Sequence, residues 1–492
     1  MTHELVSLGW AVLVAGAVMA AALAFHPVSQ RTRVPAPAFF LLAAAVASDL
    51  IPGLRNIPIE SVQRVVTVAL IFVLLDGGAS LGWRSLRPSL GAASWLGLAG
   101  TVVIAATTGT LAHVLLGFEW HPALLLGIAL APTDPAAVFS ALGRKEIGGR
   151  TGVLLNGEAG LNDPAGIALL AGVMEIGGRT GGAAVGHVAL VFAEQIAVGA
   201  MIGAGGGLAL SHLLRRVRLP GQGLYSLAVL AGALMVYGIA TVAQGSGFLA
   251  VFVTGAVLAD RRMPFEHEIE RFHDALASLG EIAAFTALGL TITLSDFGEL
   301  GAWADGTIMA VLTLLVVRPV VLMLMLQPVR LRAGERVFLS LAGLKGAVPI
   351  LLGSFIVTGH ATAGRSIYAI VFVVVAASVF VQGTSVPWLA RLCGVRMEEA
   401  PPLRPWPLGV RLRNPPRGVR RSRVQPGSAA EDSKVSELGL PEGLWIALVI
   451  RNGTLLTPRP GSRLSAGDEV VVLVDHSSDA PEDAVDQVFG TD

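Results

Sequence analysis

Ionisable residues inside apolar stretches are the first feature of this sequence that could do chemistry. Asp76, Asp134, Glu158, Asp163, Glu194, Arg318 and Lys345 interrupt runs long enough to span a membrane. A charge within a bilayer costs about 2.5 kcal/mol or more, so by default it marks a functional site. Asp76 and Glu194 have no partner evident from the sequence, and both a functional and a peripheral structural role stay open for them. Four further acids, Asp49, Glu175, Glu281 and Asp305, lie near the ends of such runs, where we expect them to reach the interface.

One interruption is Ala131-Pro132-Thr133-Asp134-Pro135, midway along an apolar run at 122–142. Two prolines three residues apart remove backbone donors and should unwind the helix there. In transporters, unwound helices near the middle of the membrane coordinate ions. A simple proline kink is the alternative, but it leaves the Thr and Asp between the prolines unexplained. We therefore expect Thr133 and Asp134 to contribute to an ion site.

A second group of polar residues in an apolar run is Gly157-Glu158-Ala159-Gly160-Leu161-Asn162-Asp163-Pro164, at 151–174. On a helix, Glu158 and Asp163 project in directions about 140° apart, so they cannot form one bidentate pair. One carboxylate can then face an ion pathway while the other pairs with a positive side chain elsewhere in the bundle. The alternative is that both carboxylates are neutralised for packing.

Two basic residues supply the positive partners. Arg318 precedes Pro319, and Lys345 lies in Gly343-Leu344-Lys345-Gly346-Ala347-Val348-Pro349, which predicts another interrupted helix. Two broken helices about 210 residues apart, at corresponding places in two halves, indicate inverted repeats. If they cross, Asp134 near positive amino ends and Lys345 near negative carboxyl ends would compensate the dipoles of the half-helices.

The composition places these residues in a polytopic membrane protein. Of 492 residues, 53% are hydrophobic and only 14% are charged, whereas soluble proteins carry about 25% charged residues. The single cysteine, Cys393, excludes an intramolecular disulfide. The 35 basic residues balance 35 acidic ones, so no overall field would recruit nucleic acid, and we expect no nucleic-acid partner. We also expect no cofactor and no enzymatic activity.

Apolar windows of about twenty residues predict thirteen spans: 5–25, 36–52, 65–82, 90–117, 122–142, 151–174, 187–211, 223–243, 246–259, 280–295, 304–326, 337–358 and 366–390. Lys and Arg collect in cytoplasmic loops. With an outside amino terminus, sixteen of them fall inside and four outside, the four being Arg55, Arg64, Arg179 and Arg365. The sequence therefore predicts an all-α polytopic fold of about 13 transmembrane helices, with inverted repeats, two crossed broken helices and a cytoplasmic carboxyl terminus.

The pattern divides the chain into a transmembrane domain at 1–392, a basic, proline-rich linker at 393–434 and a small cytosolic α+β module at 435–478. The linker interleaves prolines with seven arginines from Arg404 to Arg423, which is typical of a tether attracted to anionic lipid headgroups. In the module, Trp445, Ala447 and Val449 alternate before an Arg451-Asn452-Gly453 turn, and Val470, Val472 and Val474 alternate after it. This alternation predicts paired strands.

Several motifs together resemble the monovalent cation:proton antiporter superfamily, in its bacterial branch of sodium/proton and potassium/proton exchangers. They are Thr133-Asp134-Pro135, Asn162-Asp163-Pro164, Gly245-Ser246-Gly247-Phe248-Leu249-Ala250 with Val253-Thr254-Gly255, and Gly343 to Pro349. The tail from Ser436 through Leu440-Pro441-Glu442-Gly443 to Leu464 and Gly467-Asp468 is similar to the carboxyl-terminal module of regulators of potassium conductance (RCK_C or TrkA-C). This pairing occurs in antiporters implicated in potassium efflux, pH homeostasis and cell volume regulation.

The resemblance implies roles for the matching positions. Asp163 would bind a proton or a monovalent cation in alternation, with Thr133, Asp134 and Asn162 contributing to the site. Glu158 and Arg318 would form a structural ion pair, and Lys345 would compensate helix dipoles. Two positions depart from many relatives: Ala159 replaces a serine, which puts ion selectivity in doubt, and Lys345 replaces an arginine, which keeps the charge but not the bidentate fork.

We therefore expect electroneutral exchange of K⁺, Na⁺ or both for a proton across a bacterial inner membrane, by alternating access at Asp163. Asn162 cannot titrate, which favours one proton per cation. The resemblance also implies a homodimer, and a nucleotide or small-ligand regulator at the terminal module. A potassium efflux channel or uniporter gated by that module is the alternative, disfavoured because no selectivity-filter loop is present. A membrane receptor that binds nucleotide with its tail is weaker still, since the tail lacks a glycine-rich phosphate loop.

Overall fold

The computed structural model describes residues 34–51, 57–142, 145–177, 179, 181–217, 219–261, 263–298, 300–399, 419–440, 444–451, 454–474 and 488–489, with isolated positions before 34. The predicted span at 5–25 falls largely outside the described residues, and so does the middle of the linker, 400–418. Two compact units make up the chain, Met1–Ala400 and Pro401–Asp492, and each is described by itself.

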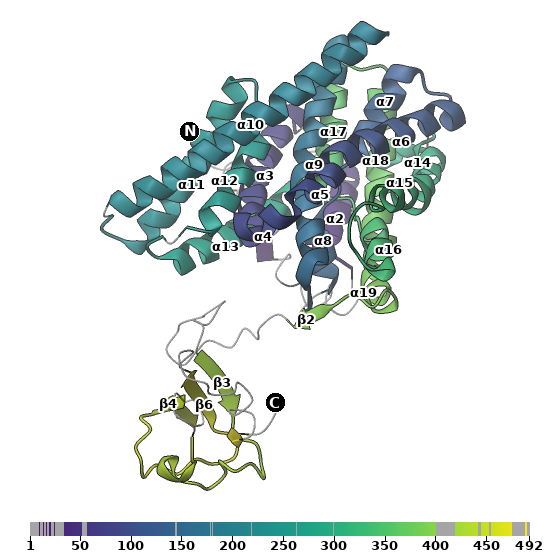
Figure 1. The fold of residues 1–492 in the computed structure, drawn as a ribbon. Coiled ribbons are helices and arrows are strands. Elements are labelled where there is room, and N and C mark those ends of the chain that lie inside the picture. Colours follow the sequence, from purple (N-terminus) through teal and green to yellow (C-terminus); the bar gives the residue numbers. More distant parts are fainter. Residues whose placement is uncertain are drawn as a thin grey trace. The chain divides into compact units, whose positions relative to one another are not determined.

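The first unit is a bundle of α-helices (Figure 1). Its helices are α2 Ala36–Leu50, α3 Ile59–Leu81, α4 Trp83–Leu86, α5 Leu90–Ser94, α6 Gly100–Leu116, α7 Trp120–Ala129, α8 Pro135–Leu142, α9 Gly149–Ile176, α10 Gly182–Arg216, α11 Gln222–Val242, α12 Gly247–Ala259, α13 Glu266–Leu290, α14 Ala302–Leu312, α15 Arg318–Met325, α16 Ala333–Leu341, α17 Ala347–Thr358, α18 Gly364–Ala377 and α19 Gly383–Leu392. Short 3₁₀ turns, η2 Arg87–Ser89 and η4 Leu294–Phe297, join some of them.

Among the described residues, six helical stretches are both long enough and apolar enough to cross a membrane. They are Ile59–Leu81, Trp83–Leu116, Gly182–Arg216, Gln222–Val242, Ala302–Met325 and Gly364–Leu392, and four shorter apolar helices accompany them. The predicted spans from 36–52 onward each coincide with a helix or a broken pair of helices. The prediction of a polytopic helical membrane protein is thereby confirmed.

Both predicted helix interruptions are present. The fifth span divides into α7 and α8 around residues 130–134, and the twelfth divides into α16 and α17 around residues 342–346. Pro135 is the first residue of α8 and Pro349 lies in the first turn of α17. A proline is tolerated there because the amide groups of the first turn have no partner within the helix.

Three π-helical turns interrupt other helices near the two breaks: η3 Trp95–Ala99, η5 Thr313–Val317 and η6 Ser378–Gln382. The turn η5 leads directly into Arg318, and η6 supplies two side chains that bond to the 341–345 segment. Such turns are rare and are frequent at functional sites. No local sequence signal predicted them.

The glycine-rich motif at 245–255 anchors α12 in the bundle. The Ser246 hydroxyl group caps α12 by accepting a hydrogen bond from Leu249 N at 3.3 Å. Thr254 Oγ1 donates to the Gly203 carbonyl of α10 at 3.0 Å. In this structure the motif therefore positions a helix and does not line the cavity described below.

The second unit contains a four-stranded antiparallel sheet in the order β3-β6-β4-β5. The strands are β3 Val419–Arg423, β4 Leu444–Arg451, β5 Thr454–Leu456 and β6 Glu469–Val474. Val424, Leu444, Val449, Leu464, Val470, Val472 and Phe489 form its small core. Arg451 pairs with Thr454 across the predicted hairpin, whose turn residues 452–453 lie outside the described residues.

Strand β3 lies in the range that the sequence analysis assigned to the linker, so the sheet begins earlier than predicted. Its composition, Val419-Arg420-Arg421-Ser422-Arg423, shows no alternation of apolar residues. The strand nevertheless pairs with β6, with Arg423 opposite Glu469. Charged residues are tolerated here because β3 is an edge strand, where they discourage further pairing.

A second, two-stranded sheet lies within the helical unit. Strand β1 Lys145–Ile147, between α8 and α9, pairs antiparallel with β2 Met397–Glu399, which follows α19. Gly148 N adds a hydrogen bond of 3.0 Å to the Arg396 carbonyl. The connection between the two helices of the predicted site is thus tied to residues 396–399, which the sequence pattern had assigned to the start of the linker.

Candidate ion-binding site

The two broken helices meet at their interruptions. Asp134 N donates a hydrogen bond of 2.8 Å to the Leu344 carbonyl, which joins the unwound segments directly. Ends of four half-helices therefore come together, with partial positive charge at the amino ends of α8 and α17 and partial negative charge at the carboxyl end of α7.

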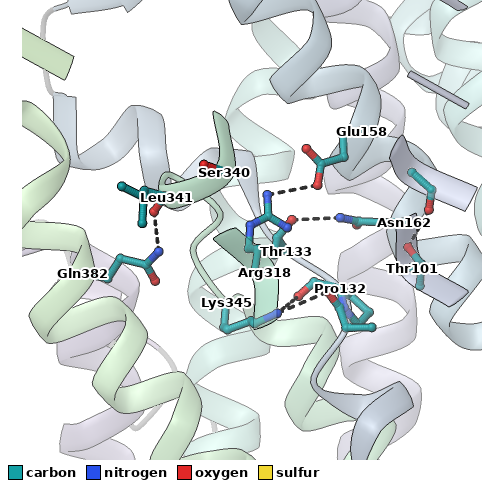
Figure 2. A network of polar contacts seen from close by, with 12 residues as sticks. Thr101, Pro132, Thr133, Glu158, Asn162, Arg318, Ser340, Leu341, Lys345 and Gln382 are labelled. Carbon is teal, nitrogen blue, oxygen red and sulfur yellow. Dashed lines mark hydrogen bonds and ion pairs between the residues drawn. The ribbon is translucent and has the colours of Figure 1, made fainter. Parts of the chain in front are cut away.

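Lys345 is placed at the carboxyl end of α7. Its ammonium group donates to the carbonyls of Leu130, Ala131 and Pro132, the last two at 3.2 Å (Figure 2). These three bonds use all three N–H donors of the group. Lys345 is only 1% exposed. Its charge therefore balances the helix end and is not directed at the cavity.

Asp134 is placed at the amino end of α8. Oδ1 accepts a hydrogen bond of 2.8 Å from Ala136 N, so the carboxylate caps the half-helix. Its Oδ2 lies against Gly346, where any added Cβ would come within 2.3 Å of that oxygen. Only glycine fits at position 346 with Asp134 in this place.

Arg318 and Glu158 form a buried ion pair beside the crossing. Arg318 Nη2 lies 3.0 Å from Glu158 Oε1, and the two side chains are 1% and 3% exposed (Figure 2). The guanidinium group fills the space next to Gly343, where a Cβ would stand 1.9 Å from Nε. The pair links α15 to α9 and does not line the cavity.

Asn162 ties α9 to the unwound segment. Its Nδ2 donates to Thr133 Oγ1 at 2.8 Å, and both residues are buried. This bond sets the position of the next residue, Asp163, relative to the crossing. Figure 2 shows Asn162 and Thr133 side by side, next to the Glu158–Arg318 pair.

A cavity of about 30 Å³ lies at the crossing. Asp163 lines it with Thr133, Asp134 and Ala136 from the fifth span, and Gly346 to Pro349 form the facing wall. Leu70 and Val73 of α3, with Glu281, Ala284 and Phe285 of α13, complete the lining. A space of this size holds one or two water-sized particles, which matches a monovalent ion or a proton-bearing water.

Glu281 and Gln382 lie at the crossing of the broken helices, although the sequence did not predict this for either residue. The expectation that Glu281 reaches the interface is wrong, because α13 begins at Glu266 and carries Glu281 into the bundle at the cavity. The signal available was its isolation as an acid within an apolar stretch. Gln382 Nε2 donates to the Leu341 carbonyl at 2.5 Å, capping the carboxyl end of α16 (Figure 2).

The two acids whose roles the sequence left open, Asp76 and Glu194, lie in different surroundings. Asp76 lies half-buried on α3, outside the cavity lining. Glu194 is exposed on α10. Neither is brought to the crossing.

A cavity between crossed broken helices, lined by a titratable acid, is the arrangement of a secondary ion transporter. A family model described as "Sodium/hydrogen exchanger, transmembrane" matches residues 16–392, and a TrkA-C domain matches residues 419–478. The chain belongs to this sodium/hydrogen exchanger family, as a multi-pass cation:proton antiporter with a carboxyl-terminal TrkA-C module.

Individual relatives agree with the family. The K(+)/H(+) antiporter NhaP2 of Shewanella sp. (strain MR-4) is 32% identical over 466 residues, covering 93% of this chain and 80% of that protein. The K(+)/H(+) antiporter NhaP of Alkalimonas amylolytica is 30% identical over 468 residues, covering 94% and 80%. The solved structure of the sodium proton antiporter MjNhaP1 from Methanocaldococcus jannaschii matches 79% of this chain and 99% of its own, with a TM-score of 0.67 and 19% identity. At that identity the likeness shows the fold.

Proposed function

We propose that this antiporter exchanges one monovalent cation, K⁺, Na⁺ or both, for one proton, with Asp163 as the group that binds them in alternation. The exchange takes place across a bacterial inner membrane, with the amino terminus outside and the TrkA-C module in the cytoplasm. A homodimer is the assembly, and a nucleotide or small ligand at the module is its regulator. The K(+)/H(+) names of the relatives support K⁺ as a substrate.

The observation that carries this proposal is the distribution of charge around the cavity. Asp134 is engaged by the amino end of α8, and Lys345 by the carboxyl end of α7. The Glu158 carboxylate is engaged by Arg318. Asp163, by contrast, lines the cavity next to Thr133, whose hydroxyl oxygen is a suitable ligand for a small cation. Asp163 is thus a cavity acid that neither a helix end nor an ion pair engages among the described residues, and it is free to exchange a proton for a cation.

Replacing Asp163 tests the assignment. Asp163→Asn should abolish exchange while the protein stays folded, because an amide neither binds a proton nor neutralises a cation. Proton uptake and release on addition of K⁺ or Na⁺ to proteoliposomes gives the rate and separates the two cations. Glu194→Gln, an exposed acid outside the cavity, is the control and should behave as the wild type. Exchange by Asp163→Asn at about a tenth of the wild-type rate or more would refute the assignment.

Electroneutrality follows from counting charge at the same group. Asp163 holds either one proton or one monovalent cation, and Asn162 cannot titrate, so both loaded forms carry the same net charge. Exchange rates should therefore not respond to a clamped membrane potential, and solid-supported membranes should record no cation-driven current. A current in the wild type would contradict one-for-one exchange and direct attention to proton release from Lys345.

A further inference from the structure

A third carboxylate lies at the crossing, on a helix to which the proposed cycle assigns no role. Glu281 of α13 lines the same cavity as Asp163 and Asp134. Its Oε1 is buried and has no hydrogen-bond partner within the part of the chain that the structure describes. An unpaired carboxylate oxygen in such a place is costly unless a proton or a cation neutralises the group.

The charges around Glu281 leave it without a fixed positive partner among the cavity residues. The two ionisable groups that share the lining with it are Asp134 and Asp163, both acidic. Lys345 Nζ is turned to the α7 carbonyls. No positively charged side chain belongs to the described lining. Protons or cations from solution must therefore neutralise the carboxylates whose charge is not balanced by a helix end.

The helices packed against α13 do not change this balance. They are α2, α3, α11 and α17. Helix α17 contributes apolar residues to the lining and contains no titratable residue. Helix α3 contributes Leu70 and Val73 to the lining. The charged residues of α3, which are Glu60, Arg64 and Asp76, lie outside the lining. The titratable groups on the other two helices have contacts elsewhere. On α2, the Asp49 carboxylate accepts a hydrogen bond from Ser295 N. On α11, the Tyr225 hydroxyl group is hydrogen-bonded to the 217–219 segment, and the Tyr237 ring packs on Phe248. On α13 itself, His273 Nδ1 donates to the Ile269 carbonyl, two turns before Glu281.

Two carboxylates in one small cavity cannot both stay ionised without a counter-charge. In a cavity of about 30 Å³ the arrival of one monovalent cation neutralises one of them and leaves the other to hold a proton. The proton that the cation displaces from Asp163 then has an acceptor, Glu281, in the lining of the same cavity.

We propose that Glu281 is a second proton-binding carboxyl group of the transport cavity, which takes up the proton that the arriving cation displaces from Asp163. Protonated Asp163, ionised Glu281 and a free cation become cation-bound Asp163 and protonated Glu281. Glu281 then releases the proton to water and returns to its ionised form. One proton leaves for each cation bound, so the exchange ratio of the proposed function, on which this inference rests, is unchanged.

The pH profile of exchange tests the role. In Glu281→Gln the neighbouring negative charge is gone, so Asp163 gives up its proton more readily and the profile should shift to lower pH by about one unit. Glu281→Asp retains the carboxyl group and should keep a profile close to that of the wild type. Glu268→Gln removes an exposed acid from the same helix and should leave the profile unchanged. All are measured in proteoliposomes with K⁺ and with Na⁺.

Infrared difference spectra on cation addition give a direct second readout. After cation addition, time-resolved spectra of the wild type should lose the protonated-carboxyl band of Asp163 and transiently gain that of Glu281, whereas Glu281→Gln should show the loss without the transient gain. A pH profile in Glu281→Gln identical to the wild type would overturn the proposal. The proposal would also be overturned if Glu281→Gln lost rate equally at every pH and Glu281→Asp did not restore the rate, because that result indicates a packing role for Glu281. The Asp163→Asn variant separates this inference from the proposed function. If Asp163→Asn retains exchange, the proposed role of Asp163 is refuted. If Asp163→Asn is inactive and the pH profile of Glu281→Gln is not shifted, only the proton transfer to Glu281 is refuted.

Discussion

At the scale of single residues, the charges at the crossing divide into those that hold the structure and those available for transport. Lys345, Asp134 and the Glu158–Arg318 pair each have fixed partners. A buried ion pair contributes little net stability, because desolvation offsets the Coulomb attraction, yet loss of one member strands a charge. In the proposed cycle the paired residues therefore serve folding, whereas Asp163 and Glu281 serve transport.

The Glu158–Arg318 pair should behave as one unit. Glu158→Gln and Arg318→Gln should each lower the stability of the detergent-solubilised protein by about 3 to 5 kcal/mol, since each leaves a buried charge without its partner. The double variant should lose less than the sum of the two. Thermal unfolding of all three proteins measures the coupling, and losses that simply add would show that the ion pair does not couple the two residues.

At the scale of elements, the helix breaks and the strand pairings position the functional side chains. The crossing brings together half-helix ends whose dipoles need compensation, and the π-helical turns next to it adjust the register of α15 and α19. In the second unit the sheet depends on a polar pair, Arg451 and Asp468, whose nitrogen and oxygen atoms lie 2.7 and 2.9 Å apart.

The pH dependence of the module should reflect Asp468. Burial opposes its ionisation, but hydrogen bonds from Arg451 and from Ser465 N outweigh burial and hold the pKa of Asp468 below its ordinary value. A depressed pKa in the folded state means that this stabilisation is present at neutral pH and is lost as the pH falls through the folded pKa. Asp468→Asn should therefore destabilise the sheet at pH 7 by about 1 to 3 kcal/mol, and by less in strong acid.

Hydrogen–deuterium exchange of the full-length protein measures this effect in peptides from β4 and β6. Asp432→Asn is the matched control: the side chain is exposed, and its left-handed backbone, with φ of 58°, is one that asparagine adopts readily. Equal exchange rates for Asp468→Asn and the control at pH 7 would show that the Arg451–Asp468 pair does not stabilise the sheet.

At the scale of the whole molecule, the proposed ion cavity and the TrkA-C module occupy separate parts of the chain. The cavity is built entirely within the helical unit. No described residue of the TrkA-C module belongs to its lining. Near the end of the helical unit, β2 pairs with β1, which lies between α8 and α9.

Two truncations should separate these roles. A chain ending after Arg404 keeps β2 and should retain exchange, with an altered dependence on pH, ligand or ionic strength. A chain ending after Val395 also loses β2 and the Gly148–Arg396 hydrogen bond, so exchange should be slower. Rates in proteoliposomes, compared at equal amounts of folded protein, test both. Complete loss of transport in the well-folded longer chain would contradict the division of labour.

The sequence by itself determined the membrane class, the spans from 36 onward and the two helix breaks, because hydropathy and proline act locally. It also singled out Asp163, Thr133 and Lys345, since a charge or a hydroxyl between prolines in an apolar run is exceptional. Only the tertiary structure decided what depends on contacts between distant segments. It brought Glu281 into the cavity, since the register of α13 is set by packing, and it paired β3 with β6 and β1 with β2. Those pairings are made by backbone hydrogen bonds, which side-chain patterns within one segment do not encode.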